Sequence, residues 1–265
     1  MDLGLISLLL CIIMPVDYKK IASEVRREAL AMIHRAQTSH IASNFSVTDL
    51  AVVLYENLKP EDRVVWSKGW AAATTYILLA RRGIIPESDL DIFPKKPYLN
   101  LVEIGVKGVE TTGGSMGHGL PVALGIALGQ KKTETKGMVY CIMSDGEMDE
   151  GTTWESIMIA AHHNLDNLTV LIDRNTWQAM GRTEDVVRLE PLEDKWKVFE
   201  WDALRVDGHD YQAIEKAILT RSSKPRVIIC NTIKGKGVSF MEDSLVFHYK
   251  YVDDDTYEKA MKELR

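Results

Sequence analysis

One stretch, residues 141–177, constrains the fold of this chain more than any other: CIMSDGEMDEGTTWESIMIAAHHNLDNLTVLIDRNTW. An apolar run over residues 138–143 is short enough for a buried strand, and an acidic, glycine-punctuated turn follows it. A helical pattern then leads to a second apolar run, residues 168–172, which ends in an Asp-Arg-Asn sequence. The stretch therefore predicts a strand–helix–strand unit in which Asp145 and Asn175 follow neighbouring strand ends.

Oxygen-bearing side chains at two strand ends indicate a ligand site. Open parallel sheets bind ligands outside the carboxyl ends of their strands. A carboxylate and an amide are hard ligands that suit Mg²⁺ or Ca²⁺, and Mg²⁺ completes its shell with phosphates and waters. Asp145 and Asn175 therefore predict a magnesium–diphosphate site. The alternative is that Asp145 caps the following helix and Asn175 forms a turn.

A glycine-rich segment, residues 113–119 (GGSMGHG), precedes an apolar helical pattern that extends to Leu128. The free backbone N–H groups of such a turn can bind an anion. Glycines also allow a helix to pack closely against a sheet, so this motif alone leaves both interpretations open. Lys234 and Lys236, together with several histidines, are candidates to contact phosphate groups.

Strand-like and helix-like patterns alternate along the rest of the chain. Apolar runs predict further strands over residues 63–66, 203–206 and 226–233. Periodicity predicts helices, in chain order, over residues 17–37, 50–58, 70–79, 87–93, 211–219 and 253–264. A capping box at residues 46–49 marks the second helix start, and residues 94–109 and 181–197 are predicted loops. This alternation predicts an α/β fold with a mostly parallel sheet flanked by helices on both faces.

Composition and charge narrow the functional class. The net charge of −6 and the lack of a dense basic run argue against a nucleic-acid partner. A hydrophobic share of 46% is enough for the core of one large domain. The three cysteines, Cys11, Cys141 and Cys230, suggest reduced thiols and no disulfide framework, so we expect a cytoplasmic protein.

The amino-terminal residues stand apart from the rest. Residues 3–14 are apolar but shorter than the roughly 20 residues that span a bilayer, and no cation precedes Lys19 as a signal peptide would require. We interpret residues 1–15 as an extension, either disordered or upstream of a true start at Met14, and residues 16–265 as one domain. We expect no membrane association; a cryptic signal or anchor and a packed interface segment are the alternatives.

The motifs in their order resemble the amino-terminal, thiamine diphosphate-binding half of transketolase. The matching segments are Ser39-His40, residues 49–55, Ser67-Lys-Gly69, Gly108-Val-Glu110, Gly114-Ser-Met-Gly117, residues 145–151, Asp173-Arg-Asn175 and Lys234-Gly-Lys-Gly237. The resemblance covers essentially residues 16–265. It implies the thiamine diphosphate-binding fold of a pyrophosphate-binding domain, with thiamine diphosphate and Mg²⁺ as cofactors and Ca²⁺ as a substitute metal.

The resemblance also implies roles for individual residues. Metal ligands would be Asp145, Asn175 and the backbone carbonyl of Trp177. Cofactor contacts would come from Gly114, Met116, Asp145, Gly146, Glu147, Asn175, His40 and His248. Catalytic roles fall to His40 and His248 in proton transfer and to Glu150, which matches a carboxylate at the dimer contact. The cofactor of this family cleaves a ketose and passes a two-carbon ketol unit to an aldose.

Some positions depart from the family pattern. Ser144 replaces the first glycine of the usual Gly-Asp-Gly, and Trp70 replaces a histidine that contacts the diphosphate. Another family histidine has no counterpart, with Asn100 near its expected place, and His118 stands where glutamine is usual. We expect Trp70 to alter donor specificity or weaken catalysis. The remaining histidines are predicted to be structural or solvated: His34, His162, His163 and His209.

The resemblance implies a partner. The family's pyrimidine-binding domain, which supplies the glutamate that activates the cofactor, has no counterpart in this sequence. We therefore predict one subunit of a split transketolase, a transferase of the pentose phosphate pathway that acts on sugar phosphates. It would be inactive without a separate carboxy-terminal partner chain and would form a homodimer contact within a heterotetramer. The alternatives are another two-subunit thiamine diphosphate enzyme (a decarboxylase or a transferase of a non-standard sugar) and a non-catalytic cofactor-binding regulator.

Overall fold

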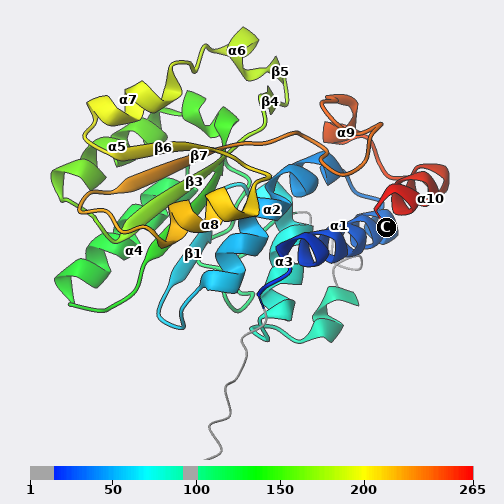
Figure 1. Cartoon of the computed structure of the whole chain (residues 1–265), viewed down its shortest axis with the longest axis horizontal. Helices are drawn as coiled ribbons and strands as arrows, with labels where there is room; N and C mark the ends of the chain where they lie inside the picture. The colour runs from blue at the N-terminus through cyan, green and yellow to red at the C-terminus, as the bar shows by residue number, and fades with distance from the viewer. Residues whose placement is uncertain (1–14, 92–100, 265) are drawn as a thin grey trace, which may run out of the picture.

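The computed structural model describes residues 15–91 and 101–264 (Figure 1). Nearly all of the predicted extension lies outside these residues, as do Asn100 and part of the loop predicted over residues 94–109. Within the described part of the chain, no helix is long and apolar enough to cross a membrane.

A five-stranded parallel sheet forms the centre of the molecule. Its strands, in spatial order, are β1 (Arg63–Trp66), β2 (Val139–Ser144), β3 (Leu168–Arg174), β7 (Arg226–Asn231) and β6 (Asp202–Asp207). The register places Ser144 beside Asp173, and Asp173 beside Cys230. The inner strands are buried on both faces, so their sequences are continuous apolar runs, which is why those runs predicted them. The predicted α/β fold is confirmed.

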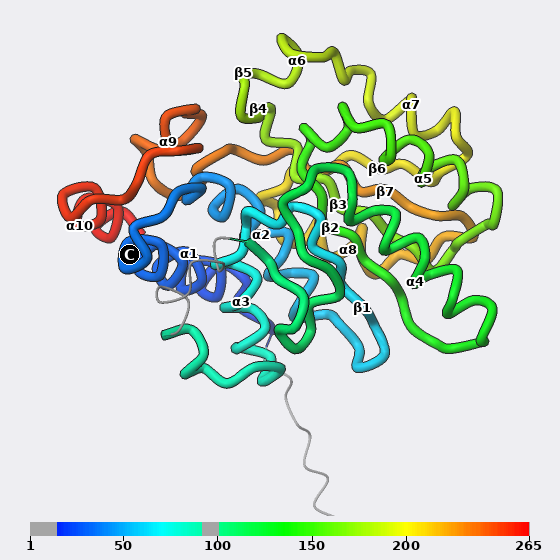
Figure 2. The backbone as a smooth tube through the Cα atoms, turned by 180° about the vertical axis from the view of Figure 1, so that it is seen from behind, coloured from blue at the N-terminus to red at the C-terminus, as the bar shows by residue number. Residues whose placement is uncertain are grey.

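Helices cover both faces of the sheet (Figures 1 and 2). The core on one face includes residues of α1 (Tyr18–Ala36), α2 (Ile41–Asn57), α3 (Ala72–Arg81), α8 (Tyr211–Leu219) and α10 (Asp254–Glu263). The core on the other face includes residues of α4 (Gly119–Lys132), α5 (Gly151–His162) and α7 (Leu192–Val198). Alternate residues of β1 show the division, since Val64 and Trp66 enter the first core and Val65 the second.

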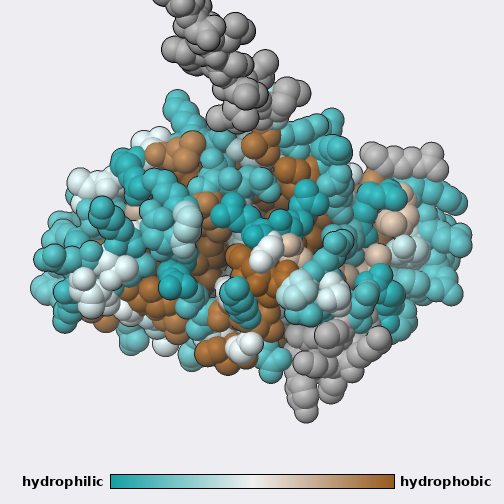
Figure 3. Space-filling view, turned by 90° about the horizontal axis from the view of Figure 1, so that it is seen from below, coloured by the Kyte–Doolittle hydropathy of each residue, from teal (hydrophilic) through white to brown (hydrophobic). Residues whose placement is uncertain are grey.

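Shorter elements complete the described chain: η1 (Gly69–Ala71), η2 (Glu87–Asp91), η4 (Asp145–Asp149), β4 (Trp177–Gln178), β5 (Gly181–Arg182), α6 (Thr183–Val186) and α9 (Val246–Tyr249). β4 and β5 form a separate antiparallel pair. Seen from below, hydrophobic side chains gather across the middle of the surface, between hydrophilic margins (Figure 3).

The predicted start of the second helix is wrong. α2 begins at Ile41, and the supposed capping box lies inside the helix. Ser46 donates to the carbonyl of Ser43 and to Asp173, and Thr48 donates to the carbonyl of Asn44, so neither side chain caps a helix end. Because α2 is buried continuously from Ile41 to Tyr55, it has no polar face whose periodicity could mark its true length.

The loop predicted over residues 181–197 is also wrong, because this segment contains β5, α6 and most of α7. Its polar sequence contains three buried hydrophobic residues, Leu189, Leu192 and Trp196. The Trp196 ring packs edge-on against Trp201 with centroids 4.7 Å apart. These few apolar contacts stabilise short helices. The sequence did not indicate them, because so polar a segment has no clear hydrophobic periodicity.

Candidate cofactor site

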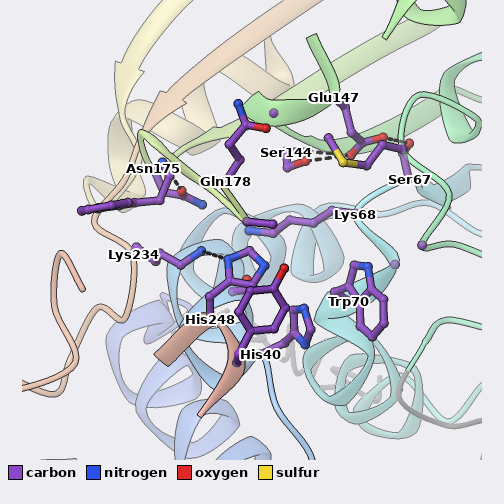
Figure 4. Close-up of a pocket in the computed structure, with 18 residues that line it drawn as sticks. His40, Ser67, Lys68, Trp70, Ser144, Glu147, Asn175, Gln178, Lys234 and His248 are labelled. Atoms are coloured by element: carbon purple, nitrogen blue, oxygen red, sulfur yellow. Dashed lines mark hydrogen bonds between the residues drawn. The ribbon is translucent and has the colours of Figure 1, made fainter. Parts of the chain in front are cut away.

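A pocket lies outside the carboxyl ends of the central strands, at the edge of the sheet that the sequence predicted. It encloses about 800 Å³ including its open mouth. The segments that follow β1, β2, β3 and β7 contribute to its lining, together with the start of α2 and the α9 region (Figure 4). Predicted site residues in the lining are His40, Gly114, Met116, Gly146, Glu147, Asn175, Trp177 and His248.

Two predicted residues lie outside this lining. Asp145 is fully buried beneath the pocket at the start of η4. Glu150 is the N-cap residue of α5. Its carboxylate accepts no hydrogen bond from the described residues that line the pocket. The parallel pairing of β2 with β3 nevertheless brings the Asp145 and Asn175 segments together, because Ser144 is in register with Asp173.

The Asp145 carboxylate is held by donors from the next strand end. Its Oδ2 accepts from Arg174 Nη1 at 2.9 Å and from the Thr176 N–H at 2.7 Å. Among the described residues, its Oδ1 accepts only from the adjacent Gly146 N–H, at 3.0 Å. Burial raises the pKa of Asp145, and the charge of Arg174 opposes that rise. The oxygen Oδ1 therefore keeps a lone pair for a further ligand.

Asn175 is oriented by its neighbours as well. Its Oδ1 accepts from the Trp177 N–H at 3.0 Å, and its Nδ2 lies 3.3 Å from Asp173 Oδ2. The amide oxygen has two lone pairs, and the hydrogen bond from Trp177 uses one of them. The structure thus supports both a turn at Asn175, as the alternative interpretation predicted, and an oxygen available to a ligand.

A buried ion pair forms the floor of the pocket. Lys68, which follows β1, donates to Asp173 Oδ2 at the end of β3. Ser46 donates to the same oxygen at 2.6 Å, and Thr232 donates to Oδ1. Burial would raise the pKa of Asp173, but Lys68 and these hydrogen bonds hold it below its usual value. The sequence did not predict this pair, because its members come from strands far apart in the chain.

Lys234, which follows β7, lies in the same pocket without such a partner. Its side chain is 1% exposed, and none of the described carboxylates forms an ion pair with it. Its Nζ contacts His248 Nδ1 at 3.1 Å (Figure 4). Burial, followed by the charge of Lys68, lowers the pKa of Lys234 to about 8. An ammonium group with no counter-ion in a buried position favours the binding of an anion.

Two histidines and two aromatic side chains form one wall. The His40 ring stacks on Trp70 with centroids 4.2 Å apart and planes 13° from parallel. The His248 ring meets His40 edge-on at 4.9 Å, and Tyr249 packs against both. Burial and the nearby lysines lower the pKa of His40 to about 4 and that of His248 to about 3. Both imidazoles are therefore neutral near pH 7.

The Glu147 carboxylate ties the loops of the pocket together. It accepts from Ser67 Oγ, from the Gly117 N–H at 3.1 Å and from the Ser144 N–H at 2.9 Å. Burial raises the pKa of Glu147 against these hydrogen bonds. The N–H of Gly117, in the glycine-rich segment, thus binds a carboxylate of this chain.

Close packing explains two glycines in and near that segment. A Cβ atom at Gly69 would lie 2.4 Å from the carbonyl carbon of Gly113, and one at Gly119 would lie 2.3 Å from Ser67. Gly114 has a φ of 104°, which only glycine adopts readily. The packing interpretation of the glycine-rich segment is therefore supported at these positions.

The remaining predicted residues lie outside the pocket. His118 is exposed, and its Nδ1 lies 3.0 Å from both Ser115 Oγ and the Met116 carbonyl. Lys236 pairs with Glu242 at 3.5 Å. His209, predicted to be structural or solvated, is half-buried and contacts Asp49 through Nδ1 at 2.6 Å.

The parallel sheet, with a pocket at the carboxyl ends of its strands, defines an α/β domain of the open-sheet class, in which ligands bind at that edge. Comparison with known families identifies the domain more closely, since the family described as "Transketolase, thiamine diphosphate binding domain" matches residues 17–264. The chain belongs to this family, which confirms the resemblance seen in the sequence.

Several relatives of similar length are named as transketolase subunits. One of them, from the apulose-4-phosphate transketolase of Actinobacillus succinogenes, is 33% identical over 265 residues, which are 94% of this chain and 96% of the relative. The same identity and coverage relate the chain to 6-deoxy-6-sulfo-D-fructose transketolase subunit SqwG of a Clostridium species. The crystal structure of transketolase from Campylobacter jejuni matches with a TM-score of 0.86 and 27% identity over 95% of this chain, which spans 43% of that transketolase.

Proposed function

We propose that the chain is the amino-terminal subunit of a transketolase that depends on thiamine diphosphate and Mg²⁺. The observation that carries the proposal is the pocket together with Asp145 beneath it: oxygen atoms at two strand ends accompany the buried ammonium group of Lys234, which forms no ion pair with any described carboxylate. A magnesium diphosphate carries both kinds of group that such a pocket would bind, a hard cation and an anion.

The residues at the strand ends fit a magnesium ion shared with a diphosphate. Asp145 Oδ1, Asn175 Oδ1 and the Trp177 carbonyl would hold the metal, with Ca²⁺ as a substitute. Among the described residues, no group of three or more His, Cys, Asp or Glu side chains could hold a metal by itself. This scarcity of protein ligands suits Mg²⁺, which keeps waters and phosphate oxygens in its shell.

Other residues would place and serve the organic cofactor. Lys234 would contact the diphosphate, where Gly146 lets the backbone approach, and Gly114, Met116 and Glu147 would line the thiamine side. When bound, thiamine diphosphate supplies the electron sink for cleaving a carbon–carbon bond. His40 and His248, both neutral near pH 7, would hold or move protons beside the reacting carbon.

The substrates would be sugar phosphates, between which a two-carbon ketol unit passes as in the pentose phosphate pathway. A second candidate is another two-subunit thiamine diphosphate enzyme, either a decarboxylase or a transferase of a non-standard sugar. Trp70 favours this candidate because an indole replaces the expected histidine in the wall of the pocket. The names of the relatives, which refer to apulose 4-phosphate and 6-deoxy-6-sulfo-D-fructose, favour it as well.

A separate carboxy-terminal subunit would complete the active site. Several relatives that match this chain over nearly their whole length are named as subunits, which supports such a partner. Glu150 occupies the N-cap position of α5, and Met158 and Ile159 of the same helix are exposed apolar residues. We assign this region to the homodimer contact within a cytoplasmic heterotetramer, with Glu150 communicating with the catalytic glutamate of the other half.

Calorimetry tests cofactor binding directly. The chain, co-purified with its carboxy-terminal subunit, should bind thiamine diphosphate in Mg²⁺ buffer and lose that binding in EDTA. Asp145→Asn and Asn175→Ala should abolish Mg²⁺-dependent binding, whereas Asp166→Asn, at an exposed ion pair with Lys131, should not. Unchanged binding by both site variants would overturn the metal assignment.

A panel of donor sugars tests the reaction. The two-subunit complex should turn over xylulose 5-phosphate with ribose 5-phosphate, while the isolated chain should show almost no activity. Turnover of only non-standard donors would favour the second candidate. Substantial turnover by the isolated chain would contradict the need for a partner.

A further inference from the structure

The end of β7 lies between two histidines that belong to different parts of the molecule. The backbone N–H of Ile233 donates to His209 Nε2 at 2.9 Å. The next residue, Lys234, reaches to the other side and contacts His248 Nδ1 at 3.1 Å (Figure 4). Two consecutive residues therefore fix one nitrogen of each imidazole.

His209 has a defined protonation pattern. A backbone N–H can only donate, so Nε2 of His209 must accept from Ile233 and carries no proton. The other nitrogen, Nδ1, then carries the proton and donates it to Asp49 Oδ2 at 2.6 Å. Asp49 is itself fixed, since Arg26 donates to both of its oxygens at 2.8 Å. The proton of His209 is thus on Nδ1.

His248 has the opposite protonation pattern. An ammonium group carries three donors and no acceptor, so His248 Nδ1 must accept from Lys234. A neutral imidazole has one proton, which then resides on Nε2. Lys234 is buried, and none of the described carboxylates pairs with its ammonium group, so none of them competes with His248 for its donors.

We propose that Lys234 is a positioning residue that holds His248 in the tautomer with its proton on Nε2. His248 then faces the pocket as a hydrogen-bond donor and not as a base. The assignment of the tautomer stands on the contacts alone. Its consequence for catalysis rests on the proposed function: His248 would donate to an oxygen of the diphosphate or of the sugar, and base catalysis would fall to another group.

Nuclear magnetic resonance of the ¹⁵N-labelled full chain tests the proposal. Long-range ¹H–¹⁵N spectra near pH 7 distinguish a protonated ring nitrogen from a bare one, and the variant His248→Gln assigns the signals. We expect a bare Nδ1 and a protonated Nε2 for His248. His209 is an internal control in the same spectrum, with a protonated Nδ1 and a bare Nε2. A protonated Nδ1 in His248 of the unmodified chain would overturn the proposal.

Substitutions at Lys234 separate the tautomer from general structural effects. Lys234→Arg keeps a group that only donates and should preserve the pattern. Lys234→Glu introduces an acceptor and should shift the proton of His248 to Nδ1, leaving the His209 signals unchanged. An unchanged His248 pattern in a folded Lys234→Glu variant would contradict the proposal.

The spectrum of the unmodified chain tests the tautomer of His248 even where a variant does not fold. Because this readout needs no turnover, it is independent of the proposed reaction. Failure of the donor panel with the expected tautomer would count against the proposed function and not against the role of Lys234.

Discussion

Two buried lysines of the same pocket differ in their partners. Lys68 donates to Asp173, a carboxylate that also accepts from Ser46 and Thr232. Among the described residues, the ammonium group of Lys234 hydrogen-bonds only to the neutral ring of His248; the charge of Lys68 adds to the cost of its own charge, and the more distant charges of Asp145 and Asp173 act against that cost. The first lysine is thus balanced by the chain, whereas the second is left with a charge that favours an anionic ligand. Breaking each pair should therefore have opposite consequences for stability and binding.

The largest effect is expected from Asp173→Ala. The substitution leaves the buried ammonium of Lys68 without its counter-ion, which should lower the free energy of unfolding by about 3–5 kcal/mol. Urea unfolding measures this loss. The control is Asp243→Ala, which breaks an exposed pair with Arg182 and should cost no more than about 1 kcal/mol. Equal losses in the two variants would refute the structural role of the Lys68 pair.

Lys234→Met should separate stability from binding. Removing an unbalanced buried charge should leave the free energy of unfolding unchanged or raise it. Loss of a charged hydrogen-bond donor to the diphosphate should weaken thiamine diphosphate binding about 10- to 100-fold. Calorimetry measures the affinity, with Lys236→Met, outside the pocket, as the matched control. If Lys234→Met unfolds as readily as Asp173→Ala, the contrast between the two lysines is wrong.

The contribution of Lys234 to the free energy of unfolding should depend on pH, and this effect should be smaller than the two above. The pKa of Lys234 is lowered to about 8 by burial and by Lys68, from an unperturbed 10.5. Between these values the unfolded chain binds more protons at this residue than the folded chain, so its contribution to stability should rise with pH. Below about pH 8 both states are protonated and the full penalty remains. The difference in urea midpoint between Lys234→Met and the unmodified chain should therefore shrink from pH 8 to 10.5; a constant difference would argue against a perturbed lysine.

Thr232→Val should produce the smallest change. It removes one donor from Asp173 and leaves the bond to Lys68 in place, so the loss of stability should be about 1 kcal/mol. Thermal unfolding measures it, and Thr232→Ser, which keeps the hydroxyl group, is the control. Cofactor affinity should be nearly the same in all three proteins; a large loss of affinity in Thr232→Val alone would mean that the two lysine environments are not independent.

The sequence predicted the sheet and the edge at which the pocket lies because those features are local. Apolar runs ended in polar residues at β2 and β3, and parallel pairing then brought Asp145 and Asn175 together. The resemblance to a family added His40 and His248, which the structure places in contact with each other. These predictions needed only strand ends and short motifs.

What the sequence could not predict depends on contacts between distant segments. Lys68 and Asp173 are 105 positions apart, and nothing local indicates that one would balance the other. The start of α2 was missed because its surroundings, and not a polar face, determine where that helix begins. The sequence predicted a structural or solvated His209, and its contacts with Asp49 and Ile233 are visible only in the folded chain.

The buried carboxylate of Glu147 has a consequence for the entropy of binding. It joins the loop after β1, the glycine-rich segment and the end of β2 through contacts to Ser67, Gly117 and Ser144. Loops that are ordered by the chain itself lose little conformational freedom when a ligand arrives, so less of the interaction energy is spent on ordering them. The Gly117 and Ser144 amides should accordingly exchange slowly with solvent before any cofactor binds, which makes this part of the pocket a preformed template.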